Sequence, residues 1–111
     1  MGEIKRRPRV REHGFVELLG EFDLRDVTNL REALDEAGEE KSVIDLSGVT
    51  FLDMQTTREL AVRLQIHAGN LVFRHPSWAV LSSIAAFGYE PWFGFGAGEA
   101  GGRITTGLRS R

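Results

Sequence analysis

The segment that decides the fold reads SVIDLSG at residues 42–48 and continues, two residues later, with FLD at 51–53. Residues 42–46 are mostly apolar and partly β-branched, which predicts a strand buried on both faces. Ser47-Gly48 is a turn signal and predicts the end of that strand. Residues 55–68 favour helix formers. The segment is therefore typical of a buried strand that leads into a helix.

On the N-terminal side of this segment, the pattern predicts a β-hairpin and then a helix. Apolar residues recur through residues 10–22 around the turn signal His13-Gly14, which predicts two short strands. In residues 24–37 the apolar positions are spaced by three and four, which is typical of an amphipathic helix. Asp26 is the expected cap of this helix, and Gly38 follows its expected end.

On the C-terminal side, the pattern predicts one more strand and one more helix. Gly69-Asn70 is the expected stop of the helix over 55–68, and a strand is expected at 71–74. Pro76 and Ser77 then mark a helix start, with Ser77 as the cap, and Gly88 closes that helix. Its expected apolar face comprises Trp78, Leu81, Ile84, Ala85 and Phe87.

The order of these elements predicts an α/β fold. An N-terminal β-hairpin is followed by alternating helices and strands, and strands joined by helices are expected to be parallel neighbours with right-handed crossovers. We therefore expect a mixed sheet of about four to five strands, with helices mainly on one face. A chain of 111 residues fits one such domain.

Composition places the chain among globular proteins and limits its partners. Hydrophobic residues make up 41% and charged residues 27%, and the net charge is −2. This charge gives no general attraction to nucleic acid or to anionic lipid, so neither partner is expected. The sequence has no apolar run of membrane-spanning length, no signal-peptide pattern and no cysteine, which favours a cytoplasmic location.

The chain divides into three expected segments. Residues 1–9 form a basic arm, residues 10–95 form the domain, and residues 96–111 form a flexible tail rich in Gly and Arg. A run of basic residues covers the first segment and the start of the second, and Pro8 interrupts it. We expect these side chains to be solvated. These cations are Lys5, Arg6, Arg7, Arg9 and Arg11.

Several chemistries are disfavoured by spacing. His13, His67 and His75 lack the spacing of metal ligands, and no phosphate-binding glycine loop lies between a strand and a helix. Asp45 with Asp53 resembles the acid pair of a phosphoryl-accepting receiver, but that class needs a late lysine, which is missing here. We therefore expect no enzyme activity, no metal and no cofactor.

Aromatic residues are dense near the C-terminus. Most of them are expected to close the core beneath the last helix. Trp92 and Phe93 follow Pro91 and are expected to be partly exposed, where they would suit a partner or a second copy in a homodimer. The cluster comprises Trp78, Phe87, Tyr89, Trp92, Phe93 and Phe95.

Five short strings together resemble the STAS domain, the fold of anti-sigma factor antagonists (anti-anti-sigma factor-like proteins) and of the cytosolic ends of some anion transporters. The resemblance spans residues 10–95, and each string alone is weak. The strings are Gly20-Glu21-Phe22-Asp23, Val43-Ile44-Asp45-Leu46-Ser47 with Val49, Phe51-Leu52-Asp53, Leu71-Val72-Phe73 with Pro76 and Ala79-Val80, and Phe87-Gly88-Tyr89.

The resemblance implies a regulatory switch that this sequence alters. In the family, the Asp matching Asp53 is usually followed by a Ser or Thr that a partner kinase phosphorylates, whereas here Met54 follows. A thioether accepts no phosphoryl group, so the position is expected to stay competent for contact. Thr56 and Thr57 are the candidate substitute phosphosites. Alternatively, Thr56 with Glu59 forms a capping box, or Asp53 caps the helix.

By resemblance, the chain is expected to be a non-catalytic bacterial protein-binding module in signal transduction and transcription regulation. Its expected partner is an anti-sigma factor of the serine-kinase type. The alternatives are a STAS scaffold subunit of a signalling or lipid-transport complex, and a sensor of a small ligand or nucleotide. The expected partner-binding residues are Asp23, Asp53, Met54, Gln55, Thr56 and Thr57.

Overall fold

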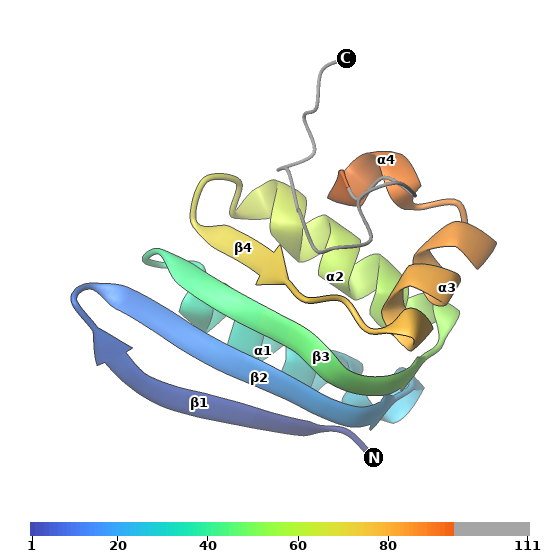
Figure 1. Cartoon of the computed structure of the whole chain (residues 1–111), viewed down its shortest axis with the longest axis horizontal. Helices are drawn as coiled ribbons and strands as arrows, with labels where there is room; N and C mark the ends of the chain where they lie inside the picture. Colours follow the sequence, from blue (N-terminus) through green and yellow to red (C-terminus); the bar gives the residue numbers. More distant parts are fainter. Residues whose placement is uncertain (95–111) are drawn as a thin grey trace.

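The computed structural model describes residues 1–94, which form one four-stranded mixed sheet with helices packed against it (Figure 1). The strand order is β1-β2-β3-β4, in which β1 and β2 are antiparallel and the other neighbours are parallel. The α/β fold expected from the sequence is therefore confirmed. The elements are β1 (Glu3–Val10), β2 (His13–Phe22), the 3-10 turn η1 (Leu24–Asp26), α1 (Val27–Ala37), β3 (Ser42–Leu52), α2 (Met54–Ile66), β4 (Leu71–Arg74), α3 (Trp78–Ala86) and α4 (Glu90–Phe93).

The core lies between the sheet and the helices α1 and α2, which lie side by side behind the strands in Figure 1. Alternate residues of β2 and β3 face this layer, as a strand period of two requires. Val16 and Leu18 of β2 and Ile44 and Leu46 of β3 are buried there. Burying a side chain of this size contributes about 2 kcal/mol each, so these rows hold the helices on one face.

The N-terminal residues correct the expectation of a basic arm. Residues 3–10 form β1, the first strand of the hairpin, and the turn lies at Arg11-Glu12 instead of His13-Gly14. Ile4 packs against the core, which ties the strand to the domain. Arg11 and Glu12 have φ angles of 53° and 75°, a left-handed geometry in which Asn-Gly is the usual sequence. Arg-Glu lacks that signature, so no local pattern predicts this turn.

The central strand β3 corrects a second expectation. It runs from Ser42 to Leu52, so Ser47-Gly48 does not end it. The register with β2 shifts twice along this stretch, so β3 carries extra residues relative to its neighbour. Gly48 fits there because a side chain at this position would collide with Leu19 of β2. The glycine therefore marks an irregularity inside the strand, which is the other meaning of an isolated strand glycine.

The helices match the expected positions, with differences at their ends. The first helix opens as η1, and Asp23 instead of Asp26 supplies its capping side chain. The helix α2 spans residues 54–66 instead of 55–68. Ser77 caps α3 through the amide of Val80, as expected.

The aromatic residues near the C-terminus divide between core and surface. Phe93 of the unexpected helix α4 is fully buried, so the expectation that it is partly exposed is wrong. Its ring lies 5.9 Å from that of Phe73, measured between ring centroids. Trp92 is partly exposed, as expected, whereas Trp78 is 81% exposed and does not belong to the apolar face of α3. Val80 and Ile84 are the buried residues of α3, and Leu81 packs against the core beside them. Phe95 and the tail over 96–111 lie outside the described residues.

Candidate functional site

The carboxyl ends of β2 and β3 lie side by side, and this alignment builds the site. The two strands are parallel, and their last residues, Phe22 and Leu52, are paired in the ladder. Asp23 follows β2 and Asp53 follows β3. The two residues therefore precede η1 and α2 at the same end of the sheet. One residue alone separates each strand from the helical turn that follows it.

Asp53 caps α2 by a reciprocal capping box. Its Oδ1 accepts the amide N–H of Thr56 at 2.9 Å, and its own N–H donates to Thr56 Oγ1 at 3.1 Å. The same N–H lies 3.2 Å from the carbonyl oxygen of Phe22. The start of α2 is therefore fastened to the ends of both strands, and the expected cap at Asp53 is confirmed.

Thr56 and Thr57, the candidate substitute phosphosites, are fully buried. The Thr56 hydroxyl lies 3.1 Å from the carbonyl oxygen of Phe22, and the Thr57 hydroxyl donates to the carbonyl oxygen of Asp53 at 2.8 Å. Both hydroxyls thus stabilise the first turn of α2. Glu59 is not the partner of Thr56, because its carboxylate binds Arg31 of α1.

Asp23 repeats the capping box at the start of η1. Its Oδ1 accepts the amide N–H of Arg25 at 2.9 Å, and its own N–H donates to Asp26 Oδ2 at 2.9 Å. The Arg25 guanidinium also lies 2.8 Å from Asp23 Oδ2. The side-chain hydrogen bond from Arg25, together with its amide, lowers the pKa of Asp23 to about 2. This carboxylate therefore stays ionised at neutral pH.

Exposed apolar side chains accompany the two caps. Met54 is the first residue of α2 and is 54% exposed, Leu24 is the first residue of η1 and is 66% exposed, and Phe51 near the end of β3 is 48% exposed. Gln55 is also exposed. We name this group the docking surface, and it comprises Asp23, Leu24, Phe51, Asp53, Met54 and Gln55. Exposed apolar groups that lie among polar ones are typical of protein contact sites.

Two members of the docking surface, Leu24 and Phe51, were not predicted from the sequence. Leu24 matches the helical spacing of buried residues, and Phe51 lies just before a predicted helix. Neither pattern indicates that the side chain is exposed. The signal that identifies both is their place beside a capping Asp at a strand end, where the chain turns away from the core. Asp45 does not join Asp53, because its Oδ1 accepts the amide of Ser47 at 2.9 Å within the strand irregularity.

An ionic seam between α1 and α2, half exposed on the α1 side and largely buried on the α2 side, supports the helix behind the docking surface. Glu59 of α2 is 3% exposed and lies 2.8 Å from Arg31 of α1. Asp35 of α1 lies 2.9 Å from Arg63 and 2.7 Å from His67, the residue after α2. The hydrogen bond from His67, and then that from Arg63, lower the pKa of Asp35. The seam joins the middle and the C-terminal part of α2 to α1.

Two other kinds of site are absent from residues 1–94. No group of three or more His, Asp and Glu side chains in this part of the chain is arranged to hold a metal ion. Within the same range, no helix has the length and apolarity needed to cross a membrane. The docking surface offers no nucleophile beside a base, since its polar groups are two capping carboxylates and an amide.

Comparison with known proteins agrees with this architecture. The family model described as Mlab, STAS domain, matches residues 6–91. A solved structure of the anti-sigma factor antagonist SpoIIAA in its unphosphorylated form is similar, with a TM-score of 0.55 and 18% identity, covering 72% of this chain and 79% of that one. A search of the curated proteins found no match. Because the family model covers most of the chain, this protein belongs to the STAS domain family.

Proposed function

We propose that this chain is a non-catalytic regulatory module that binds a partner protein through the docking surface. The observation that carries the proposal is the exposure of Met54 at the first position of α2, beside two capped strand ends. An apolar side chain held by a rigid turn suits a contact that excludes water. By resemblance to anti-sigma factor antagonists, the proposed partner is an anti-sigma factor of the serine-kinase type.

We propose further that the partner's kinase activity does not switch this contact. Met54 carries no hydroxyl, and the hydroxyls of Thr56 and Thr57 are buried on backbone carbonyls, so a kinase must open the first turn of α2 to reach them. Their proposed role is to stabilise the turn that presents Met54. Intact mass after incubation with such a kinase and ATP is expected to show no added phosphate.

The substitution Met54→Asp tests the docking surface. A carboxylate at this position is expected to weaken binding to the anti-sigma factor by about tenfold or more, because the charge would be buried at the contact. The fold is expected to persist, since an acidic residue in the first turn interacts favourably with the helix dipole. The measurement is calorimetric titration, with circular dichroism as the check on folding.

The matched control is Ile66→Asp. Ile66 is an exposed apolar residue at the far end of the same helix, so it receives the same chemical change outside the docking surface. Its affinity is expected to equal that of the unchanged chain. Equal binding by the Met54→Asp protein, or an equal loss in both variants, would contradict the site assignment.

A scaffold role is the second candidate function, and the exposure of Trp78 favours it. This side chain starts α3, lies outside the docking surface and offers a separate anchor for a second contact. A subunit of a signalling or lipid-transport complex would use both contacts at once. Sedimentation of the native assembly distinguishes the two functions, because a scaffold is expected in a particle much heavier than one or two chains.

A further inference from the structure

The strand β1 occupies one edge of the sheet and has no strand on its outer side among residues 1–94 (Figure 1). From Glu3 to Arg7 it pairs regularly with β2, and the register shifts only between Arg7 and Val10. An edge strand directs alternate backbone N–H and C=O groups away from its sheet, and these groups can pair with another extended chain. Five regular residues are enough to start such a ladder.

This edge carries a concentration of positive charge in a chain whose net charge is −2. Arg6 pairs with Glu36, Arg7 with Glu17 and Arg9 with Glu40, at 3.2, 2.8 and 3.0 Å. Solvent-exposed pairs of this kind contribute about 0 to 1 kcal/mol each, so an incoming carboxylate can replace them at little cost. Lys5 and Arg11 have no carboxylate partner within the described part of the chain.

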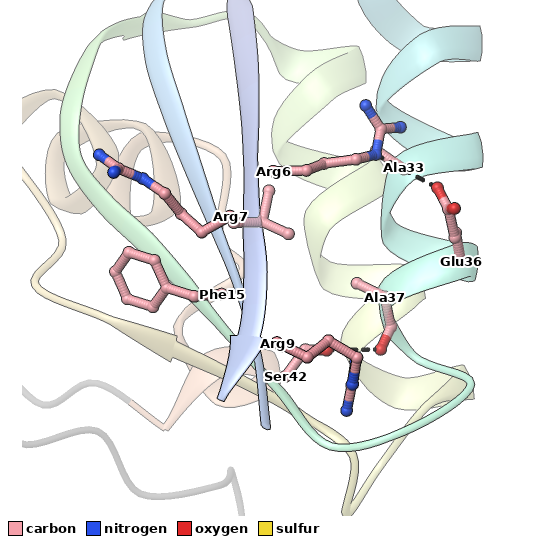
Figure 2. Close-up of a pocket in the computed structure, with 10 residues that line it drawn as sticks. Arg6, Arg7, Arg9, Phe15, Ala33, Glu36, Ala37 and Ser42 are labelled. Carbon is pink, nitrogen blue, oxygen red and sulfur yellow. Dashed lines mark hydrogen bonds and ion pairs between the residues drawn. The ribbon is translucent and has the colours of Figure 1, made fainter. Parts of the chain in front are cut away.

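The arrangement of the arginines distinguishes an extended ligand from a small anion. A cavity of about 180 Å³ lies beside the irregular end of β1, lined in part by Arg6, Arg9 and Ser42. Figure 2 shows that Arg6 and Arg7 leave the strand in opposite directions and that the guanidinium groups do not meet in the cavity. Cations on both faces of one strand match an added strand, whose side chains also alternate between the faces.

We propose that the edge of β1 from Glu3 to Arg7 binds an extended acidic segment of a partner protein, which joins the sheet as a fifth strand. Charge on an edge strand commonly prevents pairing with other chains. The same charge admits an acidic strand, because cross-strand pairs then have opposite sign. A second copy is disfavoured, since two β1 strands side by side would bring cations together.

The proposed contact is separate from the docking surface. Because β1 is antiparallel to β2, Arg7 lies opposite Phe15 near the start of β2, whereas the docking surface lies beyond the end of β2 at Phe22. Glu3, at the other end of the segment, lies opposite Leu19. The proposed contact therefore runs along the outer side of β1, whereas the docking surface lies past the carboxyl ends of β2 and β3, and one partner can reach both or two partners can bind together. Loss of one contact is expected to leave the other unchanged.

The probe is a blocked ten-residue peptide that alternates Glu with Val or Thr, titrated into the full chain. Reversing two cations on one face of the strand with Lys5→Glu and Arg7→Glu is expected to weaken binding by about tenfold or more. Arg58→Glu is the matched control, because Arg58 is exposed on α2 and no ion pair involves it among residues 1–94. Affinity of this control is expected to be unchanged, and circular dichroism confirms that each variant folds.

Two further peptides separate strand addition from simple charge attraction. One carries N-methyl groups on its odd amides and the other on its even amides, so that each removes the donors along one edge. Strand addition is expected to make one of the two bind about tenfold more weakly than the other, because one edge faces β1. Equal binding by both would overturn the proposal. So would failure of the unmodified peptide to bind, or charge-dependent binding to phosphatidylserine vesicles without peptide binding.

Discussion

The two capped strand ends share a capping box but differ in the groups that contact it. Asp23 and Asp53 each follow a strand, each form a capping box and each precede an exposed apolar residue. Asp23 starts a short 3-10 turn and lies beside Arg25, whose guanidinium partly neutralises the negative charge of the carboxylate. Asp53 starts a thirteen-residue helix and is bound by Thr56. Unlike Asp23, it forms no ion pair within residues 1–94.

The difference shows which cap organises the site. Thr56 joins Asp53 to Phe22, so the start of α2 depends on a buried network that crosses from one strand to the other. The cap at Asp23 is closed by a local salt bridge at the surface. We therefore expect changes in the Asp53 cap to alter the whole docking surface, and changes in the Asp23 cap to stay local.

The largest effect is expected from Thr56→Val. Valine keeps the volume of the side chain but removes a hydroxyl that the Asp53 amide donates to, in a fully buried position. The variant loses the contacts of this hydroxyl with the amide and carboxylate of Asp53 and with the carbonyl oxygen of Phe22, which is expected to lower the free energy of unfolding by about 2 to 3 kcal/mol. Urea denaturation measures this loss. Thr57→Val is the control, and its single hydroxyl bond predicts a loss of about 1 kcal/mol.

A smaller effect is expected from removing the caps themselves. Asp53→Ala is expected to lower the free energy of unfolding by about 1 to 2 kcal/mol, in the range measured for N-cap residues. Asp23→Ala is expected to lower it by less, because η1 is short and its cap is more exposed. Urea denaturation of both variants gives the order. A greater loss from Asp23→Ala would mean that the Asp23 cap, and not the Asp53 cap, organises the site.

The smallest effect is expected from pH. The pKa of Asp23 falls from its usual value of 3.8 to about 2 on folding, so its ionised form favours the folded state. This contribution is complete above pH 3.8 and disappears as the pH falls through about 2. In the Arg25→Gln variant the pKa of Asp23 is expected to rise toward 3.8, as measured by NMR titration of the carboxyl group. An unchanged pKa would mean that Arg25 does not hold the charge.

The sequence predicted the layers of the fold because hydrophobic spacing is a local signal. The buried run over 42–46 and the spacing in 24–37 identified a strand and a helix that the structure contains. Asp53 was identified as a cap by its position before a helical segment, and the structure confirms that role. Local patterns were sufficient wherever the neighbouring residues in sequence are also the neighbours in space.

The remaining features depend on partners distant in the sequence. The burial of Thr56 follows from its approach to Phe22, which lies 34 residues earlier, and no local pattern reports such a contact. β1 was missed because its outward residues are charged and its turn, Arg11-Glu12, has no glycine. In both cases the feature depends on a contact between segments that are separated in the sequence. The spacing of residues within one segment does not report such contacts.

The single-residue connections at Asp23 and Asp53 have a consequence for the kinetics of association. Since no loop intervenes between strand and helix, Leu24 and Met54 are held in one arrangement before any partner arrives. Little conformational entropy then remains to be lost on binding, which is the condition for a preorganised contact. Substitutions at these two positions are accordingly expected to alter the lifetime of a complex more than the rate at which it forms.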